Sequence, residues 1–248
     1  MSEAAENNQL LLISGESATG KSASLMNIRD QEDWLYLNTE SGKRLPFRNN
    51  FRDGGFRITD PYEVIDAFEF AINDDPSVKG IILDSLTFWM DMLETQYVIT
   101  AADTRAAWGE YQQTFKRLMQ ELVPKFAKPV IIIAHTRTDH DEATMSMRTS
   151  VPIKGALRNT GVEAYFSTVV SSKVMPLKQL EEYKNDMLTI TEDDKLIDMK
   201  YVFQTRHTKK TTGERIRSPL GFFGVNETFI NNDAQMVLDH LNKMYGVN

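Results

Sequence analysis

The stretch "LLISGESATGKSASL" (residues 11–25) joins an apolar run to a glycine-rich loop with the spacing GxxxxGKS. Loops of this spacing turn backbone N–H groups toward phosphate oxygens, while the lysine reaches the terminal phosphates and the next hydroxyl ligates Mg²⁺. The stretch therefore predicts a strand, a phosphate-binding loop and a helix, in that order. The predicted contacts to ATP are Gly15, Glu16, Ser17, Ala18, Thr19, Gly20, Lys21, Ser22 and Ala23.

Four apolar runs have the continuous pattern of strands that are covered on both faces of a parallel sheet. They are "LLLIS" (10–14), "WLYLN" (34–38), "GIILD" (80–84) and "VIIIAH" (130–135). Helical patterns lie between them, at residues 21–29, 61–73 and 104–126. Strands that alternate with helices predict an α/β fold with a mostly parallel sheet flanked by helices.

The pattern changes after residue 150. A short helix is expected over 153–164, followed by the β-rich runs "YFSTVVSS" and "LIDMKYVFQTRH". The segments around "TTGE" predict a C-terminal antiparallel β-hairpin in which Gly213 takes a positive φ. The amphipathic segment "DAQMVLDHLNKMY" predicts a final helix.

Composition favours an ordinary globular protein. The 248 residues are 41% hydrophobic, enough for one large core, and we expect a single domain over 1–248 with a disordered tail at 1–9. The absence of cysteine excludes disulfides and thiolate metal sites and is consistent with a reducing cytoplasm. The acidic start, with no basic leader, and the lack of an 18-residue apolar run predict a soluble protein without a membrane partner.

Polar residues at the ends of three apolar runs suggest chemistry on the bound phosphate. Asp84 closes "GIILD" and is placed to hold Mg²⁺ together with Ser22. Glu40, two residues beyond the second run, is a candidate to orient the attacking water. His135, at the end of the fourth run, is a candidate to sense the γ-phosphate, although a single histidine is as often structural.

This order of motifs resembles the RecA-type ATPase core. The segments "LDSLTFW", "WGEYQQTFKRLMQEL" and "VIIIAHT" are more narrowly similar to compact phage-encoded RecA-like ATPases that act as single-strand annealing recombinases. The resemblance covers about residues 9–217. It implies that Lys21 and Ser22 contact phosphate and magnesium, Asp84 is the Walker B residue, Glu40 is the catalytic glutamate and His135 is the γ-phosphate sensor. It also implies a homo-oligomer, filament or ring, in the cytoplasm of a bacterial host if the protein is phage-encoded.

Two basic segments carry what the resemblance implies about partners. The net charge of −7 argues against a protein that coats nucleic acid by general basicity, so single-stranded DNA must bind at a local patch. The segment after His135 corresponds to a mobile DNA-binding loop, and its candidate contacts are Arg137, Arg148, Lys154 and Arg158. The segment "TRHTKKTTGERIR" corresponds to the region that sends cations into a neighbouring subunit's ATP site, with Arg206, Lys209 and Lys210 as candidates.

Three functions remain open at this stage. The first is a DNA-stimulated, Mg²⁺-dependent ATPase that binds single-stranded DNA and promotes annealing and recombination, with a single-strand DNA-binding protein as an additional partner. The second is a DnaB-like ring helicase, because histidine at the sensor position is typical of that group. The third is a nucleotide-switched binding module with little turnover.

Overall fold

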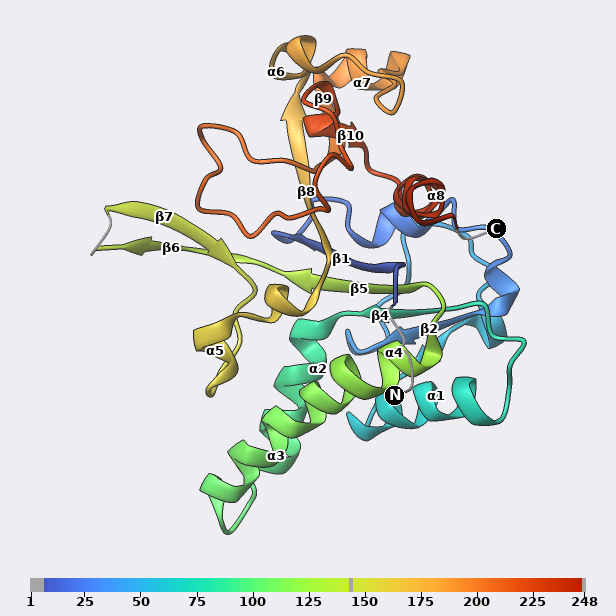
Figure 1. Cartoon of the computed structure of the whole chain (residues 1–248), viewed down its shortest axis with the longest axis vertical. Coiled ribbons are helices and arrows are strands. Elements are labelled where there is room, and N and C mark those ends of the chain that lie inside the picture. The colour runs from blue at the N-terminus through green and yellow to red at the C-terminus, as the bar shows by residue number, and fades with distance from the viewer. Residues whose placement is uncertain (1–6, 143–144, 247–248) are drawn as a thin grey trace.

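The computed structural model describes residues 7–142 and 145–246, and in these ranges eight strands form one sheet in the order β10-β9-β8-β1-β5-β4-β2-β3 (Figure 1). Neighbouring strands from β8 to β3 are parallel, whereas β9 and β10 run antiparallel. The strands are β1 Leu10–Gly15, β2 Trp34–Asn38, β3 Phe56–Arg57, β4 Gly80–Asp84, β5 Val130–His135, β8 Thr168–Pro176, β9 Met199–Gln204 and β10 Phe229–Asn231. The four predicted parallel strands are confirmed as β1, β2, β4 and β5.

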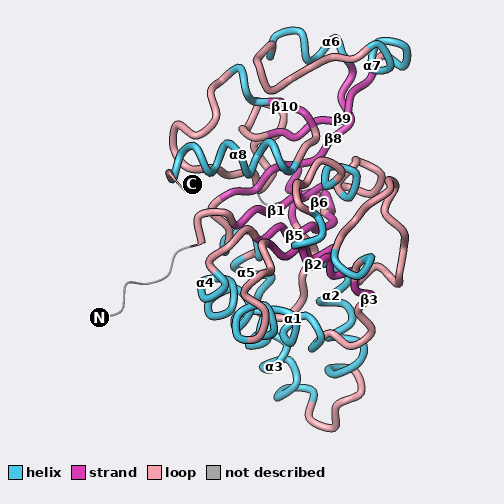
Figure 2. The backbone as a smooth tube through the Cα atoms, turned by 90° about the vertical axis from the view of Figure 1, so that its right-hand side faces the viewer, coloured by secondary structure: helices cyan, strands magenta, loops and turns pink. Residues whose placement is uncertain are grey.

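Helices cover both faces of this sheet. One face carries α1 (Tyr62–Asn73), α2 (Leu86–Leu93), α3 (Thr104–Arg117) and α4 (Val123–Phe126), and the other carries α8 (Ala234–Tyr245) (Figures 1 and 2). Successive side chains of a strand point to opposite faces, so Leu10 and Leu12 join the core under the first group while Leu11 and Ile13 join the core under α8. Both faces of β1 are therefore buried, as its continuous apolar sequence requires.

The predicted helices are confirmed at 61–73, 104–126 and the C-terminal amphipathic segment. The second of these is α3 and α4 joined through a π-helical turn, Leu118–Leu122. The helix expected at 21–29 is only one 3-10 turn, Ser22–Leu25, because the serines and the asparagine in this stretch favour caps and turns over a helix interior. The helix expected at 153–164 is two short pieces, α5 (Leu157–Thr160) and Val162–Tyr165.

The antiparallel C-terminal part is confirmed, but its connections differ from the prediction. β8 pairs with β9 across a long excursion that contains α6 (Leu177–Leu180) and α7 (Glu192–Ile197). The strands on either side of "TTGE" are β9 and β10, and residues 205–228 between them form a long loop instead of a tight hairpin. Gly213 does not take a positive φ, so that prediction is wrong. The reason is that residues 211–214 pack on another hairpin.

That second hairpin consists of β6 (Arg137–Asp141) and β7 (Ser146–Ser150) and projects from the main sheet (Figure 1). The sequence led us to expect a mobile loop here. Thr149 donates its backbone N–H to the carbonyl of Gly213 at 3.0 Å, so the two basic segments of the sequence lie against one another.

The N-terminal tail is only partly described. Residues 1–6 of the tail expected at 1–9 lie outside the described residues. Asn7, in contrast, donates from Nδ2 to the carbonyls of Val123 and Lys128, so the tail prediction is wrong from residue 7 onward. None of the helices over 7–142 and 145–246 has the length and apolarity needed to cross a bilayer.

Candidate active site

The glycine-rich loop follows β1 directly and is fastened by residues from the C-terminal half of the chain. Ser172 of β8 donates from Oγ to the carbonyl of Thr19 at 2.7 Å, and Asn232 donates from Nδ2 to the carbonyl of Gly20 at 2.8 Å. A Cβ at position 15 would lie 2.6 Å from the carbonyl oxygen of Ser172, so only glycine allows β8 to approach this closely. Gly20 has φ of 91°, which glycine adopts without strain. The predicted phosphate-binding loop is thus held in a curled conformation.

Lys21, the one Lys or Arg of residues 15–23, is buried, with 5% of its surface exposed. Its Nζ donates to the carbonyl of Glu16 at 2.6 Å, so the side chain lies across the loop that it follows. Burial lowers the pKa of Lys21 to about 8, although the nearby carboxylates of Asp84 and Glu40 oppose this change. A triphosphate in the loop would supply the missing negative charge.

Asp84 ends β4 and meets Ser22 across the loop. Ser22 Oγ donates to Asp84 Oδ2 at 2.8 Å, and the hydroxyl of Tyr36, from β2, donates to the same oxygen at 2.9 Å. The other oxygen, Oδ1, is buried and has no hydrogen-bond partner among the described residues. Burial, followed by repulsion from Glu40, raises the pKa of Asp84 despite the hydrogen bonds from Ser22 and Tyr36.

These oxygens are the kind of ligands that Mg²⁺ prefers. A carboxylate and a hydroxyl are hard donors, and Mg²⁺ is commonly held by one or two protein groups together with substrate phosphates. The unpartnered Oδ1 of Asp84 shows that the carboxylate still has capacity for a ligand. The residues present therefore fit a magnesium ion at Ser22 and Asp84.

Glu40 and His135 come together at the ends of β2 and β5. His135 Nε2 lies 2.7 Å from Glu40 Oε1, and Lys43 Nζ donates to Glu40 Oε2 at 3.0 Å. The hydrogen bond from His135, reinforced by Lys43, lowers the pKa of Glu40 to about 2 even though the group is partly buried. Glu40 is therefore a carboxylate over the whole neutral range.

The strand ends that carry these groups are cross-linked. Thr39 Oγ1 donates to the carbonyl of Ser85 at 2.7 Å, and its backbone N–H donates to the carbonyl of Asp84 at 2.8 Å. Glu40 follows Thr39 directly, so its position relative to Asp84 is set by backbone contacts between β2 and β4. Neighbouring parallel strands end at the same edge, which is how residues 44 positions apart meet.

One cavity of about 460 Å³ connects all of these groups. Its walls include the predicted Lys21, Ser22, Glu40, Asp84 and His135, together with most of the loop. Residues not predicted from the sequence also line it: Tyr36, Asn38, Lys43, Arg44, Leu45, Pro46 and Tyr201. Lys43 and Arg44 lie in the same loop after β2 as Glu40, so their closeness to Glu40 in the sequence is a signal that could have identified them. No comparable signal exists for Tyr201, Ser172 or Asn232, which arrive through tertiary folding.

The predicted DNA-binding cations lie outside this cavity. Arg137 pairs with Asp139 at 2.8 Å on the exposed face of β6, and Lys154 pairs with Glu94 at 2.7 Å. Arg148 lies on β7, and Arg158 is exposed on α5. Arg137 and Arg148 thus lie on the projecting hairpin, Lys154 and Arg158 follow it in the chain, and the carboxylates of Asp139 and Glu94 neutralise Arg137 and Lys154.

The predicted trans-acting cations lie in the loop between β9 and β10. Arg206 donates from Nη1 to the carbonyl of Phe223 at 2.7 Å, which ties it to its own chain. Lys209 and Lys210 are exposed and form no ion pair with any residue over 7–142 and 145–246. None of the three lines the cavity of its own chain.

The family model described as AAA domain matches residues 7–213 of the 248. The chain belongs to the AAA domain family. No curated protein matches the sequence. Solved structures that match include the KaiC-like protein of the hyperthermophilic archaeon Pyrococcus horikoshii OT3, with 12% identity, a TM-score of 0.45, and coverage of 82% of this chain and 81% of that one. The family match covers the glycine-rich loop and all of the strand ends that line the cavity.

Proposed function

We propose that the protein hydrolyses ATP with Mg²⁺ at the cavity beside β1. The observation that supports this best is that two hydrogen-bonded pairs line one cavity: Ser22 with Asp84 at 2.8 Å, and His135 with Glu40 at 2.7 Å. The loop and Lys21 hold the triphosphate, and Ser22 and Asp84 hold Mg²⁺, which neutralises charge on the transferred phosphoryl group.

In this proposal Glu40 orients the attacking water, and His135 senses the γ-phosphate. The pKa of about 2 makes Glu40 a weak base while His135 and Lys43 are bonded to it. A γ-phosphate offers His135 and Lys43 an alternative anionic partner to Glu40. ATP binding therefore frees Glu40 for water at the moment when a reacting phosphate is present.

We further propose that an oligomer of this ATPase binds single-stranded DNA and promotes annealing and recombination, as the phage recombinases that it resembles do. The connectivity supports this, because β6 begins at Arg137, two residues after His135. A change at the γ-phosphate sensor is therefore transmitted along two residues to the hairpin that carries Arg137 and Arg148. In this proposal Lys209 and Lys210 reach the neighbouring subunit's ATP.

The ATPase proposal is tested by phosphate release from purified protein. Lys21→Ala is expected to abolish ATP binding or turnover, and Glu40→Gln to retain binding while losing at least about 100-fold in turnover, the lower end of the range for acid–base groups. Glu32→Gln, at an exposed position that does not line the cavity, is a matched control. Turnover by Glu40→Gln at the control's rate would remove Glu40 from this role.

The DNA proposal is tested with complementary labelled oligonucleotides and a tailed duplex. ATP-dependent pairing without strand displacement supports annealing, whereas displacement would indicate the helicase alternative. ATP binding with negligible phosphate release at saturating single-stranded DNA would indicate the nucleotide-switched module. Specific ATPase activity that stays constant on dilution below assembly would contradict a contribution in trans from Arg206, Lys209 or Lys210.

A further inference from the structure

A short segment between β2 and β3 concentrates basic and aromatic residues. Residues 43–57, "KRLPFRNNFRDGGFR", contain five basic residues, three phenylalanines and one acidic residue, and we refer to them as the arginine segment. The basic residues are Lys43, Arg44, Arg48, Arg52 and Arg57. Such a density of positive charge in a chain of net charge −7 creates a local field opposite in sign to that of the whole protein.

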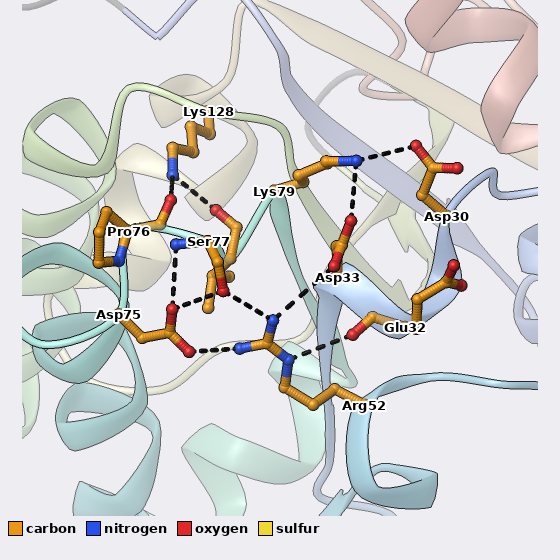
Figure 3. A network of polar contacts seen from close by, with 10 residues as sticks. Asp30, Glu32, Asp33, Arg52, Asp75, Pro76, Ser77, Lys79 and Lys128 are labelled. Carbon is orange, nitrogen blue, oxygen red and sulfur yellow. Dashed lines mark hydrogen bonds and ion pairs between the residues drawn. The ribbon is translucent and has the colours of Figure 1, made fainter.

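Two members of the arginine segment fasten it to the body. Arg52 donates to Asp75 at 2.6 Å and to Ser77 at 3.1 Å, and Figure 3 shows its guanidinium turned inward among these groups. Phe51 is 1% exposed and stacks on Tyr36, with ring centroids 5.3 Å apart. These contacts hold the segment in place, and the functions of Arg52 and Phe51 are accounted for by them.

The remaining arginines have no such partners. Arg44, Arg48 and Arg57 are exposed and form no ion pair within the described part of the chain. Phe56 has 36% of its surface exposed, and Phe47 is half-buried. A cavity of about 410 Å³ is lined by Arg44, Phe47, Phe56 and Arg57. The surface thus offers cations outside ion pairs beside one exposed ring, Phe56, and one half-buried ring, Phe47, which also packs against the core.

Unpaired cations and aromatic rings together suit one class of ligand. Arginines without carboxylate partners bind phosphates without first breaking an ion pair, and each contact releases counterions from a nucleic acid. Exposed phenylalanine rings stack on bases only where the bases are not already paired. The hairpin at β6–β7 is less suited to this, because Arg137 is paired with Asp139.

We propose that the arginine segment binds single-stranded DNA, with Arg44, Arg48 and Arg57 on the backbone phosphates and Phe47 and Phe56 stacked on bases. This inference rests on the proposed function and names a surface for its DNA step. It also links that step to ATP, because the two cavities share Tyr36, Asn38, Lys43, Arg44 and Leu45. A bound DNA strand that draws Lys43 away from Glu40 removes one of the two hydrogen bonds that make the Glu40 carboxylate a weak base.

The test is fluorescence anisotropy of a labelled oligothymidylate at several salt concentrations. The variant Arg48→Gln/Arg57→Gln is compared with the control Arg105→Gln/Lys125→Gln, which removes the same number of positive charges. Arg105 and Lys125 are also exposed and form no ion pair within the described part of the chain. The first variant is expected to reduce the slope of log affinity against log salt by about 1.4, since each single-strand phosphate contact contributes about 0.7. Thermal unfolding midpoints confirm that both variants are folded.

Phe56→Leu tests stacking without a change of charge. Loss of one stacked base is expected to weaken oligothymidylate binding about 5- to 150-fold, with little effect on binding to a blunt duplex. Equal weakening for the duplex and the single strand would overturn the stacking assignment.

The remaining outcomes separate the two proposals. Equal affinity and salt slope for the segment variant and the control, with a loss in Arg137→Gln, would overturn the arginine segment while leaving the DNA function in place. A raised half-saturation for ATP with unchanged DNA binding would assign the segment to the nucleotide and also overturn the inference. Absence of DNA binding by the wild-type protein, with ATP hydrolysis dependent on Lys21, would overturn every DNA assignment but not the ATPase.

Discussion

Tyr36→Phe removes a single hydroxyl from the buried side of the proposed magnesium site and leaves the ring in place. The ring of Tyr36 stacks on Phe51 at an interplanar angle of 18°, so phenylalanine at this position keeps the packing. The change deletes the 2.9 Å hydrogen bond to Asp84 Oδ2 and leaves Ser22 as the carboxylate's remaining hydrogen-bond donor among the described side chains.

The size of the effect depends on the charge of Asp84. A hydrogen bond to an ionised group contributes about 1.5–3 kcal/mol to the free energy of unfolding, and one between neutral groups about 0.5–1.5 kcal/mol. Burial raises the pKa of Asp84, so the native carboxyl keeps its proton to a higher pH than the unfolded one, and the stability that this proton provides is lost as pH rises through the native pKa. The difference in the free energy of unfolding between Tyr36→Phe and wild type should therefore grow with pH, from about 0.5–1.5 kcal/mol where Asp84 is protonated to about 1.5–3 kcal/mol where it is ionised.

Urea unfolding followed by tryptophan fluorescence between pH 5 and pH 8 measures this difference, and Mg²⁺ titrations of ATPase activity measure its functional counterpart. Loss of the hydrogen bond raises the pKa of Asp84 further, so the variant should need more Mg²⁺ than wild type, most of all at acidic pH. Tyr165→Phe is the control, because its ring packs on Phe115 while its hydroxyl has no hydrogen bond among the described residues. A pH-independent loss of stability equal to that of the control would refute the role of Tyr36.

Three other predictions follow from the same structure. Burial gives Lys21 a pKa of about 8, so above that pH the binding of ATP must be accompanied by uptake of a proton. Calorimetry should then show the affinity for ATP falling about tenfold per pH unit above pH 8, and an affinity that stays constant to pH 9.5 would contradict this. Gly15→Ala places a Cβ 2.6 Å from the Ser172 carbonyl and should lower the free energy of unfolding by about 1–3 kcal/mol, which thermal denaturation would detect; unchanged stability would show that β8 yields freely. Arg52→Met removes the contact to Asp75 and should speed tryptic cleavage within residues 43–57, whereas cleavage at the wild-type rate would show that the segment is held by other contacts.

The parallel half of the fold could be predicted from the sequence because its signals are local. Each central strand is an uninterrupted apolar run, and the glycine spacing with its lysine and serine fixes the loop between β1 and the following turn. Glu40, Asp84 and His135 could be placed at one edge because parallel strands end together. The cavity confirms that these residues lie together, while their roles stay predictions.

The parts that could not be predicted depend on contacts between distant residues. "TTGE" does form a turn, in which the Glu214 N–H donates to the Thr211 carbonyl, but the backbone contact between Thr149 and Gly213 places that turn against β7 instead of between adjacent strands of the sheet. In the sequence Tyr36 is one more residue of an apolar strand, and only the fold shows that its hydroxyl donates to Asp84. The arginine segment was visible as a composition, but its unpaired cations could be recognised only once the ion pairs were known.

The fastening of the glycine-rich loop by Ser172 and Asn232 has a consequence for synthesis of the protein. Thr19 and Gly20 leave the ribosome early, yet the side chain that bonds the Gly20 carbonyl comes 212 residues later. A nascent chain can form β1 and the loop sequence long before it can hold the loop in its final shape. The loop of a nascent chain therefore gains this contact to its final conformation only after Asn232 has been synthesised.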